Sequence, residues 1–200
     1  MAVCKGEKIM KQHLYPIFAE KWLRPGGTIY FYSDPHFADE EMKYLRKNYI
    51  GDDEQIRRIK SRIGKCDTLI ILGDIGDPTP LKQIRCYKVL ICGNHDRGAT
   101  YYAEYFNEVY TGPLFVSDRI LLSHEPINLP YALNIHGHDH SNSEQVAPHH
   151  LNLCAEHIDY IPISFKSIIK FGLLRDVPSI HRITVDNAII RKEQKKNESN

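Results

Sequence analysis

The stretch TIYFYSDPH, residues 28–36, runs from five β-branched, aromatic or apolar residues into a Ser and then Asp34-Pro35-His36. A short apolar run bounded by Gly, Pro or Asp is typical of a buried strand. Similar runs occupy residues 68–72, 89–92, 120–122 and 132–135. All five lead into possible metal ligands, namely Asp34-Pro35-His36, Gly73-Asp74 with Asp77, Gly93-Asn94-His95-Asp96, Ser123-His124-Glu125 and Gly137-His138-Asp139-His140. Because sites in open α/β sheets lie at the carboxyl ends of strands, we predict a two-metal site at this edge.

The ligand types at this edge indicate which ions it suits. Imidazoles and carboxylates hold Mn, Fe or Zn better than Ca. Two neighbouring ions require a bridging carboxylate, for which Asp74 is the best candidate. On an extended chain the middle residues of Asp34-Pro35-His36 and His138-Asp139-His140 point away, so we expect both outer residues of each triplet to face one ion.

Length and composition favour one enzyme domain. We expect residues 1–200 to form a single domain with a core at about 28–170, an N-terminal extension at 1–26 and a frayed tail at 192–200. The hydrophobic content of 42% suffices for a sizeable core. The formal charge of +1 makes no strong electrostatic case for nucleic acid or an anionic membrane.

Cysteine usage and hydropathy bear on location. The five cysteines are odd in number and lack CxxC spacing, which predicts reduced thiols and a cytoplasmic protein. No apolar stretch approaches the roughly 18 residues of a membrane span, so no membrane partner is expected. The first 24 residues lack the apolar core of a signal peptide.

The remaining periodicity predicts helices and hairpins around these strands. An apolar stripe at Ile56, Ile59 and Ile63 predicts a helix over 52–63, capped by Asp52 or Asp53. We also expect a helix at 100–109, a hairpin of 114–116 with 119–122, a strand at 151–154, a Ser-capped helix at 164–171 and a hairpin of 180–185 with 188–191. A βαβ front half and a hairpin-rich back half predict an α/β fold of two packed mixed sheets with helices outside.

The five motifs, in this order, resemble those of the calcineurin-like metallophosphoesterases, and the match covers about residues 28–169. The resemblance implies a metallophosphoesterase-type sandwich of two mixed β-sheets flanked by helices (four-layer αββα). It also implies hydrolysis of phosphoester bonds by attack of a metal-bound hydroxide, whose formation a divalent ion favours by lowering the pKa of bound water. The implied cofactors are two divalent transition-metal ions, with Mn favoured and Fe, Zn, Ni or Co as alternatives.

Carried over to this chain, the resemblance implies a role for each motif residue. One ion would be held by Asp34, His36, Asp74 and His140, and the other by Asp74, Asn94, His124 and His138. His95 matches the histidine that contacts the phosphate and protonates the leaving group, and Asp77 matches the acid that orients it. Asp77 could instead be a helix cap before Pro78. We expect structural roles for Asp96, His136 and Asp139.

The chain departs from the protein phosphatases of this family. These place one arginine after Gly-Asp-x-x-Asp and another before Gly-Asn-His, where this chain has Pro78 and Cys92. Two guanidinium groups that would bind a phosphate dianion are therefore absent. Their absence favours phosphodiesters, which carry one negative charge, and we expect the substrate to be a small phosphoester. Two alternatives stay open: a nucleic-acid-processing nuclease or phosphatase, given basic clusters at 57–65 and 191–196, and a non-catalytic scaffold, against which His95 counts.

Overall fold

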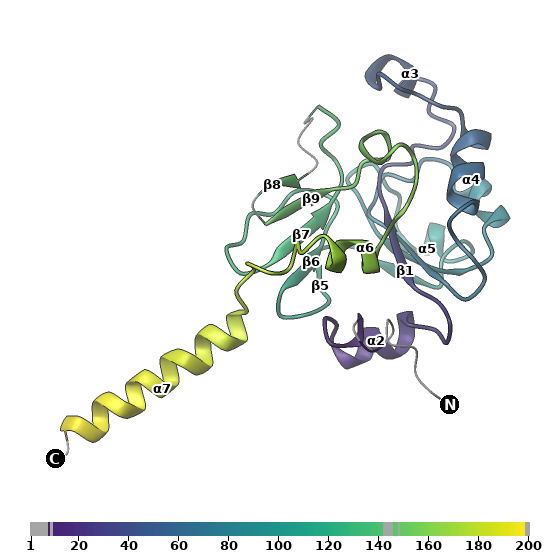
Figure 1. The fold of residues 1–200 in the computed structure, drawn as a ribbon. Coiled ribbons are helices and arrows are strands. Elements are labelled where there is room, and N and C mark those ends of the chain that lie inside the picture. The colour runs from purple at the N-terminus through teal and green to yellow at the C-terminus, as the bar shows by residue number, and fades with distance from the viewer. Residues whose placement is uncertain (1–7, 9, 142–145, 148, 199–200) are drawn as a thin grey trace.

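The computed structural model describes residues 8, 10–141, 146–147 and 149–198, and in these the strands form two five-stranded sheets (Figure 1). The first sheet has the order β10 (Ile163–Ser164), β1 (Ile29–Tyr32), β2 (Thr68–Ile71), β3 (Tyr87–Ile91) and β4 (Glu108–Tyr110). The second has the order β5 (Leu114–Phe115), β6 (Ile120–Leu122), β7 (Leu133–His136), β9 (His150–Asn152) and β8 (Val146–Ala147). Each of the five apolar runs therefore contains a strand, as the sequence predicts.

Both sheets are mixed. Strands β1 to β4 are parallel neighbours, and β10 joins β1 antiparallel. In the second sheet β6, β7 and β9 are parallel, while β5 and β8 are antiparallel edge strands. Parallel pairing brings the carboxyl ends of neighbouring strands to one edge. The predicted α/β class with two mixed sheets is confirmed.

Short helices connect and cover the strands, and one longer helix, α7 (Ile180–Glu198), projects away from them (Figure 1). The short helices are α2 (Pro16–Trp22), α3 (Met42–Leu45), α4 (Asp52–Lys60), α5 (Ala99–Tyr102), α6 (Phe165–Lys170) and the 3₁₀ helices η1 (Thr79–Gln83) and η2 (Ala155–Ile158). Helix α4 lies beside η1, and α6 beside β1 and β10. The predicted serine cap of α6 is confirmed, because the Ser164 hydroxyl accepts the backbone N–H of Ser167 at 3.1 Å. None of the described helices combines the length and the apolar character that a membrane span requires.

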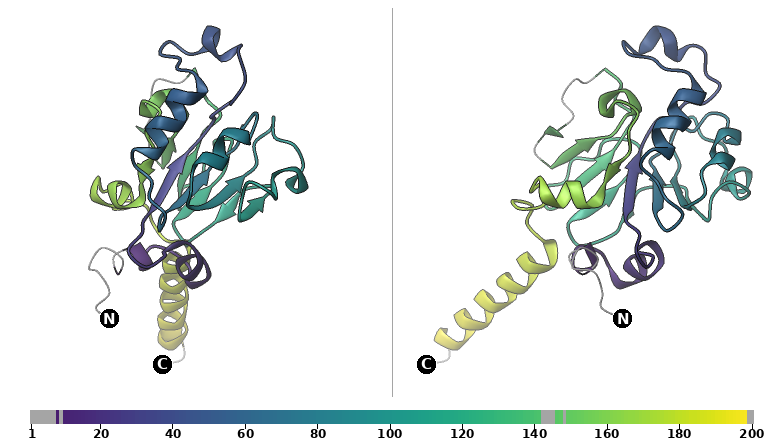
Figure 2. Two further views of the ribbon diagram at one scale, coloured as in Figure 1. Left: turned by 90° about the vertical axis from the view of Figure 1, so that its right-hand side faces the viewer. Right: turned by 45° about the vertical axis from the view of Figure 1, so that its right-hand side comes forward.

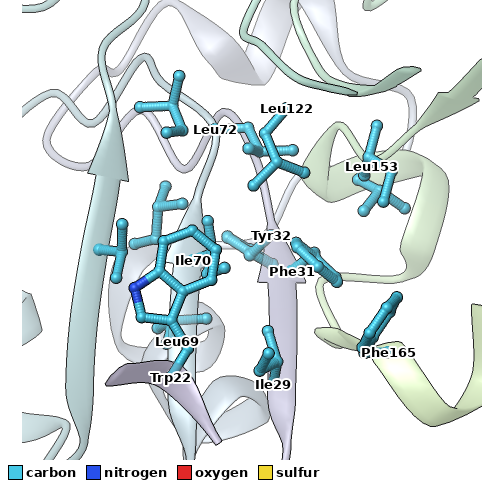
Figure 3. Close-up of a cluster of buried hydrophobic side chains, with 14 of the residues drawn as sticks. Trp22, Ile29, Phe31, Tyr32, Leu69, Ile70, Leu72, Leu122, Leu153 and Phe165 are labelled. Carbon is cyan, nitrogen blue, oxygen red and sulfur yellow. The ribbon is translucent and has the colours of Figure 1, made fainter. Parts of the chain in front are cut away.

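Apolar side chains from both sheets meet in one core (Figure 3). Phe31 of β1 and Phe165 of α6 pack edge to face with their ring centroids 6.0 Å apart. Leu122 brings the second sheet into the same cluster. Trp22 of α2 is buried there and donates to Glu108 of β4 at 3.0 Å. The segment before β1 therefore packs on the core that β1 helps to build.

Three local predictions are wrong. The helix expected at 100–109 ends at Tyr102, because Asn107 bonds to both the N–H and the carbonyl of Lys88 and draws the chain into β4. Helix α4 has Gly51 as its N-cap, while the Asp52 carboxylate accepts the N–H of Ala38 at 2.9 Å.

The predicted hairpin at 180–191 is instead part of one helix, α7, which continues to Glu198. An ion pair between Arg182 and Asp186, four residues apart, joins successive turns of this helix at 3.1 Å. Figures 1 and 2 show α7 projecting away from both sheets, which leaves isoleucines such as Ile183 and Ile190 exposed.

Candidate metal centre

The predicted ligands gather where the carboxyl ends of the two sheets meet. The backbone N–H of His138, after β7, donates to Asp34 Oδ2, after β1, at 3.0 Å. His124, after β6, has its Nδ1 2.9 Å from the carbonyl oxygen of Leu72, after β2. These contacts join the sheets at one edge, as the strand pattern predicts.

Backbone conformation aims several of these side chains. Asp34, His36, Asp74 and His138 all have positive φ, between 46° and 69°. Non-glycine residues adopt this left-handed region infrequently and tend to do so at functional sites. Hydrogen bonds hold the strained segments, since the N–H of His36 donates to the carbonyl of Asp74 at 3.0 Å.

The prediction of an extended chain at Asp34-Pro35-His36 and His138-Asp139-His140 is therefore wrong. In residues 138–140 consecutive i to i+2 backbone bonds tighten the chain, with Asp139 N–H donating to Gly137 and His140 N–H to His138. His138 and His140 consequently belong to different groups of ligands. Asp34 and His36 do share a group, but through left-handed turns.

The first ligand group is Asp34, His36 and His140, whose ligand atoms lie within 4.8 Å of one another. Asp34 Oδ1 is 3.9 Å from His36 Nε2 and 3.6 Å from His140 Nε2. Asp34 Oδ1 and His36 Nε2 are buried and have no hydrogen-bond partner among the described residues. Buried polar atoms without a partner are costly, so a cation here would satisfy both.

The second ligand group is Asp74, His124 and His138, also within 4.8 Å. Asn94 joins it, because its Oδ1 lies 2.8 Å from His124 Nε2 and 3.2 Å from His138 Nδ1. The two rings are themselves close, with His124 Nε2 3.1 Å from His138 Nδ1.

Asp74 lies between the two groups. Its Oδ2 is 3.6 Å from His36 Nε2 in the first group and 3.4 Å from His124 Nε2 in the second. All seven predicted ligands thus converge, with one carboxylate in contact range of both clusters. Nitrogen and oxygen ligands of this kind suit divalent transition metals, so the residues fit such ions.

Charge and burial shift several pKa values in this cluster. Burial lowers the pKa of His36. Burial also opposes charge on His124, but the Asp74 and Asp34 carboxylates outweigh it and raise the pKa of His124 to about 9. For Asp74 burial acts upward, yet contact with His124 and His36 brings its pKa below the usual value. Buried carboxylates in the cluster therefore favour a proton on His124, and ion binding there would release that proton.

His95 and Asp77 are placed differently from each other. His95 is exposed, its ring centroid is 6.2 Å from that of His36, and its backbone N–H donates to Asp74 Oδ1 at 3.1 Å. Asp77 accepts the N–H and hydroxyl of Thr79 at 3.0 and 2.7 Å. Among the described residues no hydrogen bond joins Asp77 to His95, so an orienting role for Asp77 stays a prediction.

The Asp96 carboxylate accepts more hydrogen bonds than the position of Asp96 in its sequence motif indicates. One carboxylate oxygen accepts the N–H groups of Asp74 and Gly93, at 3.0 and 2.8 Å. The other accepts from the N–H of Ile75 and the hydroxyl of Tyr102, both at 2.9 Å. A single side chain therefore clamps the turns after β2 and β3 together.

Glycines allow these turns to approach. Gly73 has φ +87°, and a Cβ on it would lie 2.7 Å from the backbone N and Cα of Gly93. Gly93 in turn has the backbone N of Asp74 2.8 Å from its own Cβ position. Side chains at either position would push the two ligand turns apart.

Three residues near the first group were missed in the sequence. Glu156 Oε1 lies 2.6 Å from His140 Nδ1, and Arg46 donates to the carbonyl of Asp34 at 2.6 Å. Cys154 places its thiol 3.3 Å from Asp34 Oδ2. Arg46 follows no strand, and Glu156, although it comes two residues after the strand predicted at 151–154, belongs to no spaced motif.

Comparison with known proteins supports the fold described above. No protein-family model matches the chain, and no curated protein matches it. A crystal structure of a protein of unknown function from Aquifex aeolicus is similar, with a TM-score of 0.61 and 28% identity over 73% of this chain and 100% of that chain. The Pseudomonas putida nuclease MPE gives a TM-score of 0.40 and 22% identity over 55% of this chain and 60% of the nuclease. The Aquifex protein supports the two-sheet α/β architecture, and its activity is unknown.

Proposed function

We propose that this protein is a metal-dependent phosphoesterase of the calcineurin-like kind, with the four-layer αββα sandwich of that family. In this proposal it binds two divalent transition-metal ions, Mn being favoured, and hydrolyses phosphodiesters in preference to monoesters. The observation that carries the proposal is the position of Asp74, whose Oδ2 lies within 3.6 Å of a ligand nitrogen in each group.

Each residue has a role in this proposal. Asp34, His36, Asp74 and His140 would hold one ion, and Asp74, Asn94, His124 and His138 the other. The ions would supply Lewis acidity toward a phosphoryl oxygen. His95 remains outside both groups, exposed beside His36, where its imidazole can donate a proton to a leaving oxygen.

The surroundings support a diester. A hollow of about 230 Å³ borders the second group and is lined by Asn94, Thr111, Pro113, Glu125 and others. Another, of about 470 Å³, borders His138 and His140 and is lined by Leu45, Pro126, Asp139 and Ser141. A diester carries a substituent on each side of phosphorus, and two hollows next to the ligand groups offer room for both.

The cations near the site also favour the diester. Pro78 and Cys92 stand where protein phosphatases of this fold carry arginines. Arg97 packs its guanidinium carbon 4.5 Å from the centre of the Tyr101 ring, and Arg46 is buried against Asp34 and Glu156. Burial and the ion pair with Glu156 therefore keep Arg46 from clamping a monoester dianion.

The test is kcat/KM with Mn on bis-nitrophenyl phosphate and nitrophenyl phosphate. We expect a clear preference for the diester. A clear preference for the monoester would defeat the diesterase proposal, and no turnover of either ester by protein loaded with two ions would defeat the phosphoesterase itself.

One observation favours a second candidate, a nucleic-acid-processing enzyme. A hollow of about 510 Å³ is lined by Lys60, Lys65, Lys82 and Arg85 and by no acidic residue. In the described chain none of these four cations forms an ion pair. The hollow lies before β2 and β3, at the sheet edge opposite the ligands, and could hold the phosphate backbone of a long substrate.

Oligonucleotide cleavage separates the two candidates. A variant with Lys60, Lys65, Lys82 and Arg85 changed to Gln should lose activity on single-stranded oligonucleotides, and keep activity on the small diester, if nucleic acid is the substrate. Equal activity of variant and wild type on both substrates would remove the second candidate.

A further inference from the structure

A buried network lies behind the first ligand group. Arg46, which follows α3, and Glu156, in η2, form an ion pair with Nε and Oε2 3.2 Å apart. Their side chains are 0% and 7% exposed. Burying two charged groups costs desolvation free energy, so an ion pair at this depth calls for a structural or functional explanation.

The network touches two predicted ligands. Glu156 Oε1 is 2.6 Å from His140 Nδ1, while Arg46 Nη2 donates to the backbone carbonyl of Asp34 at 2.6 Å. The opposite face of the His140 ring presents Nε2 to Asp34 Oδ1 at 3.6 Å. One end of the imidazole is thus fixed by a carboxylate, and the other faces the first ligand group.

The carboxylate decides which ring nitrogen carries the proton. An ionised carboxylate only accepts hydrogen bonds, so a neutral His140 beside Glu156 must hold its proton on Nδ1. That leaves the lone pair on Nε2, the nitrogen that faces Asp34. A carboxylate on the far nitrogen is also a usual way to orient a metal-binding histidine and increase its basicity.

We propose that Glu156 is a positioning residue that fixes His140 in the Nδ1–H tautomer with Nε2 directed into the first ligand group, and that the ion pair with Arg46 holds the Glu156 side chain in place. The proposal rests on the proposed function only in taking His140 as a metal ligand. Its role in the metal-free protein, the choice of tautomer, stands independently of any reaction.

Nitrogen-15 NMR of metal-free protein with labelled histidine tests the tautomer. The His140 signals are assigned from their loss in His140→Gln. At a pH where the ring is neutral we expect Nδ1–H in the wild type and in Glu156→Gln, whose amide oxygen still accepts. In Glu156→Ala we expect a mixture. A wild-type ring protonated on Nε2, or an unchanged tautomer in Glu156→Ala, would overturn the proposal.

Metal affinity gives a second readout. Calorimetric titration with Mn should show the first ligand group weakened roughly 10–100-fold in Glu156→Ala, the usual cost of losing such a partner. Glu156→Gln should restore part of the affinity because it keeps the hydrogen bond. Glu54→Gln is the matched control, since Glu54 pairs with Arg57 and Arg58 on an exposed helix face. Equal affinity in all four proteins would count against the proposal.

The outcomes separate this inference from the proposed function. If no phosphoester is hydrolysed but the tautomer and affinity change as expected, the positioning role stands and the phosphoesterase fails. If esters are hydrolysed and neither Glu156 variant changes tautomer or affinity, the reverse holds. Circular dichroism of each variant establishes that it is folded, and Glu156→Gln keeps the test decisive if Glu156→Ala is not.

Discussion

The two ligand groups share Asp74 but differ in how their polar atoms are partnered. In the first, Asp34 Oδ1 and His36 Nε2 are buried and find no hydrogen-bond partner in the described part of the chain. In the second, Asn94 Oδ1 and His124 Nε2 lie 2.8 Å apart, so an ion must separate groups that already bond to each other. Two metal sites joined by one carboxylate therefore need not be equally prepared for their ions. We expect the first group to bind its ion with the higher affinity.

The largest effect should come from Asp74→Asn, because this change reaches both groups at once. We expect both Mn sites to weaken by more than the roughly 10–100-fold that a lost outer partner costs, and turnover to fall below detection. Mn titration and diester hydrolysis are the measurements. Asp139→Asn is the control for Mn binding alone, since its carboxylate accepts from Ser141 and belongs to neither group, while the residue lines a hollow assigned to the substrate. Similar losses of Mn affinity in both variants would break the bridging assignment.

Next in size is His95→Ala, which should leave the two groups intact. His95 is exposed and reaches Asp74 only through its backbone N–H, so both ions should still bind. Turnover should fall by about 10²–10⁴, the range for general acid–base catalysis. The fall should be smaller for a nitrophenyl ester than for an ester with a poor leaving group. Loss of an ion in this variant would contradict the role given to His95.

The difference in Mn affinity between the two ligand groups can be measured by Mn titration of the wild type. Separating the hydrogen bonds of the second group costs about 1–3 kcal/mol, since each net bond contributes about 1 kcal/mol, so we expect two steps roughly 10–100-fold apart. His140→Ala should remove the tighter step and His124→Ala the weaker one. Two equal steps, or the opposite assignment, would refute the comparison.

A smaller effect is expected from Asp96→Asn, which loosens the clamp between the turns that carry Asp74 and Asn94. Replacing an acceptor of four hydrogen bonds should lower the free energy of unfolding by about 1–3 kcal/mol in urea denaturation. The exposed Asp176→Asn serves as control and should stay within about 0.5 kcal/mol. Equal stability of the two variants would show that the clamp contributes nothing.

The smallest effect should follow removal of α7 from Ile180 onward. The helix projects from both sheets and its isoleucines are 43–51% exposed (Figure 1). We expect the free energy of unfolding to change by no more than about 0.5 kcal/mol and both Mn steps to persist. A change in either step would mean that α7 acts on the ligand groups.

The sequence predicts the strands and the ligand positions because both follow short-range rules. The run from Thr28 to Tyr32 has no charged residue, and the ligand motif begins two residues later, at Asp34. Once parallel strands are expected, their carboxyl ends must meet at one edge. The convergence of Asp34, Asp74 and His138 follows from that placement.

The remainder depends on contacts that no local pattern encodes. Arg46 and Glu156 lie far apart in sequence and meet only when the loop after α3 folds over η2. The β-branched residues of 180–185 favour strand on propensity, yet without a partner strand a helix satisfies its own backbone. Asp96 reads as a turn residue until the two turns that it bridges are seen together.

The close approach at Gly73 and Gly93 limits how related chains with this fold can change in sequence. A Cβ on either glycine would meet the side chains of His124 or Asp74, but also the backbone of the other turn at 2.7–2.8 Å, and this second contact does not depend on which side chains bind an ion. A descendant that lost its histidines and its chemistry would still need both glycines to keep its strands in register at this edge. In a lineage these glycines should therefore persist with the fold, whereas Asp74 and Asn94 beside them should persist only where the proposed metal-dependent activity does.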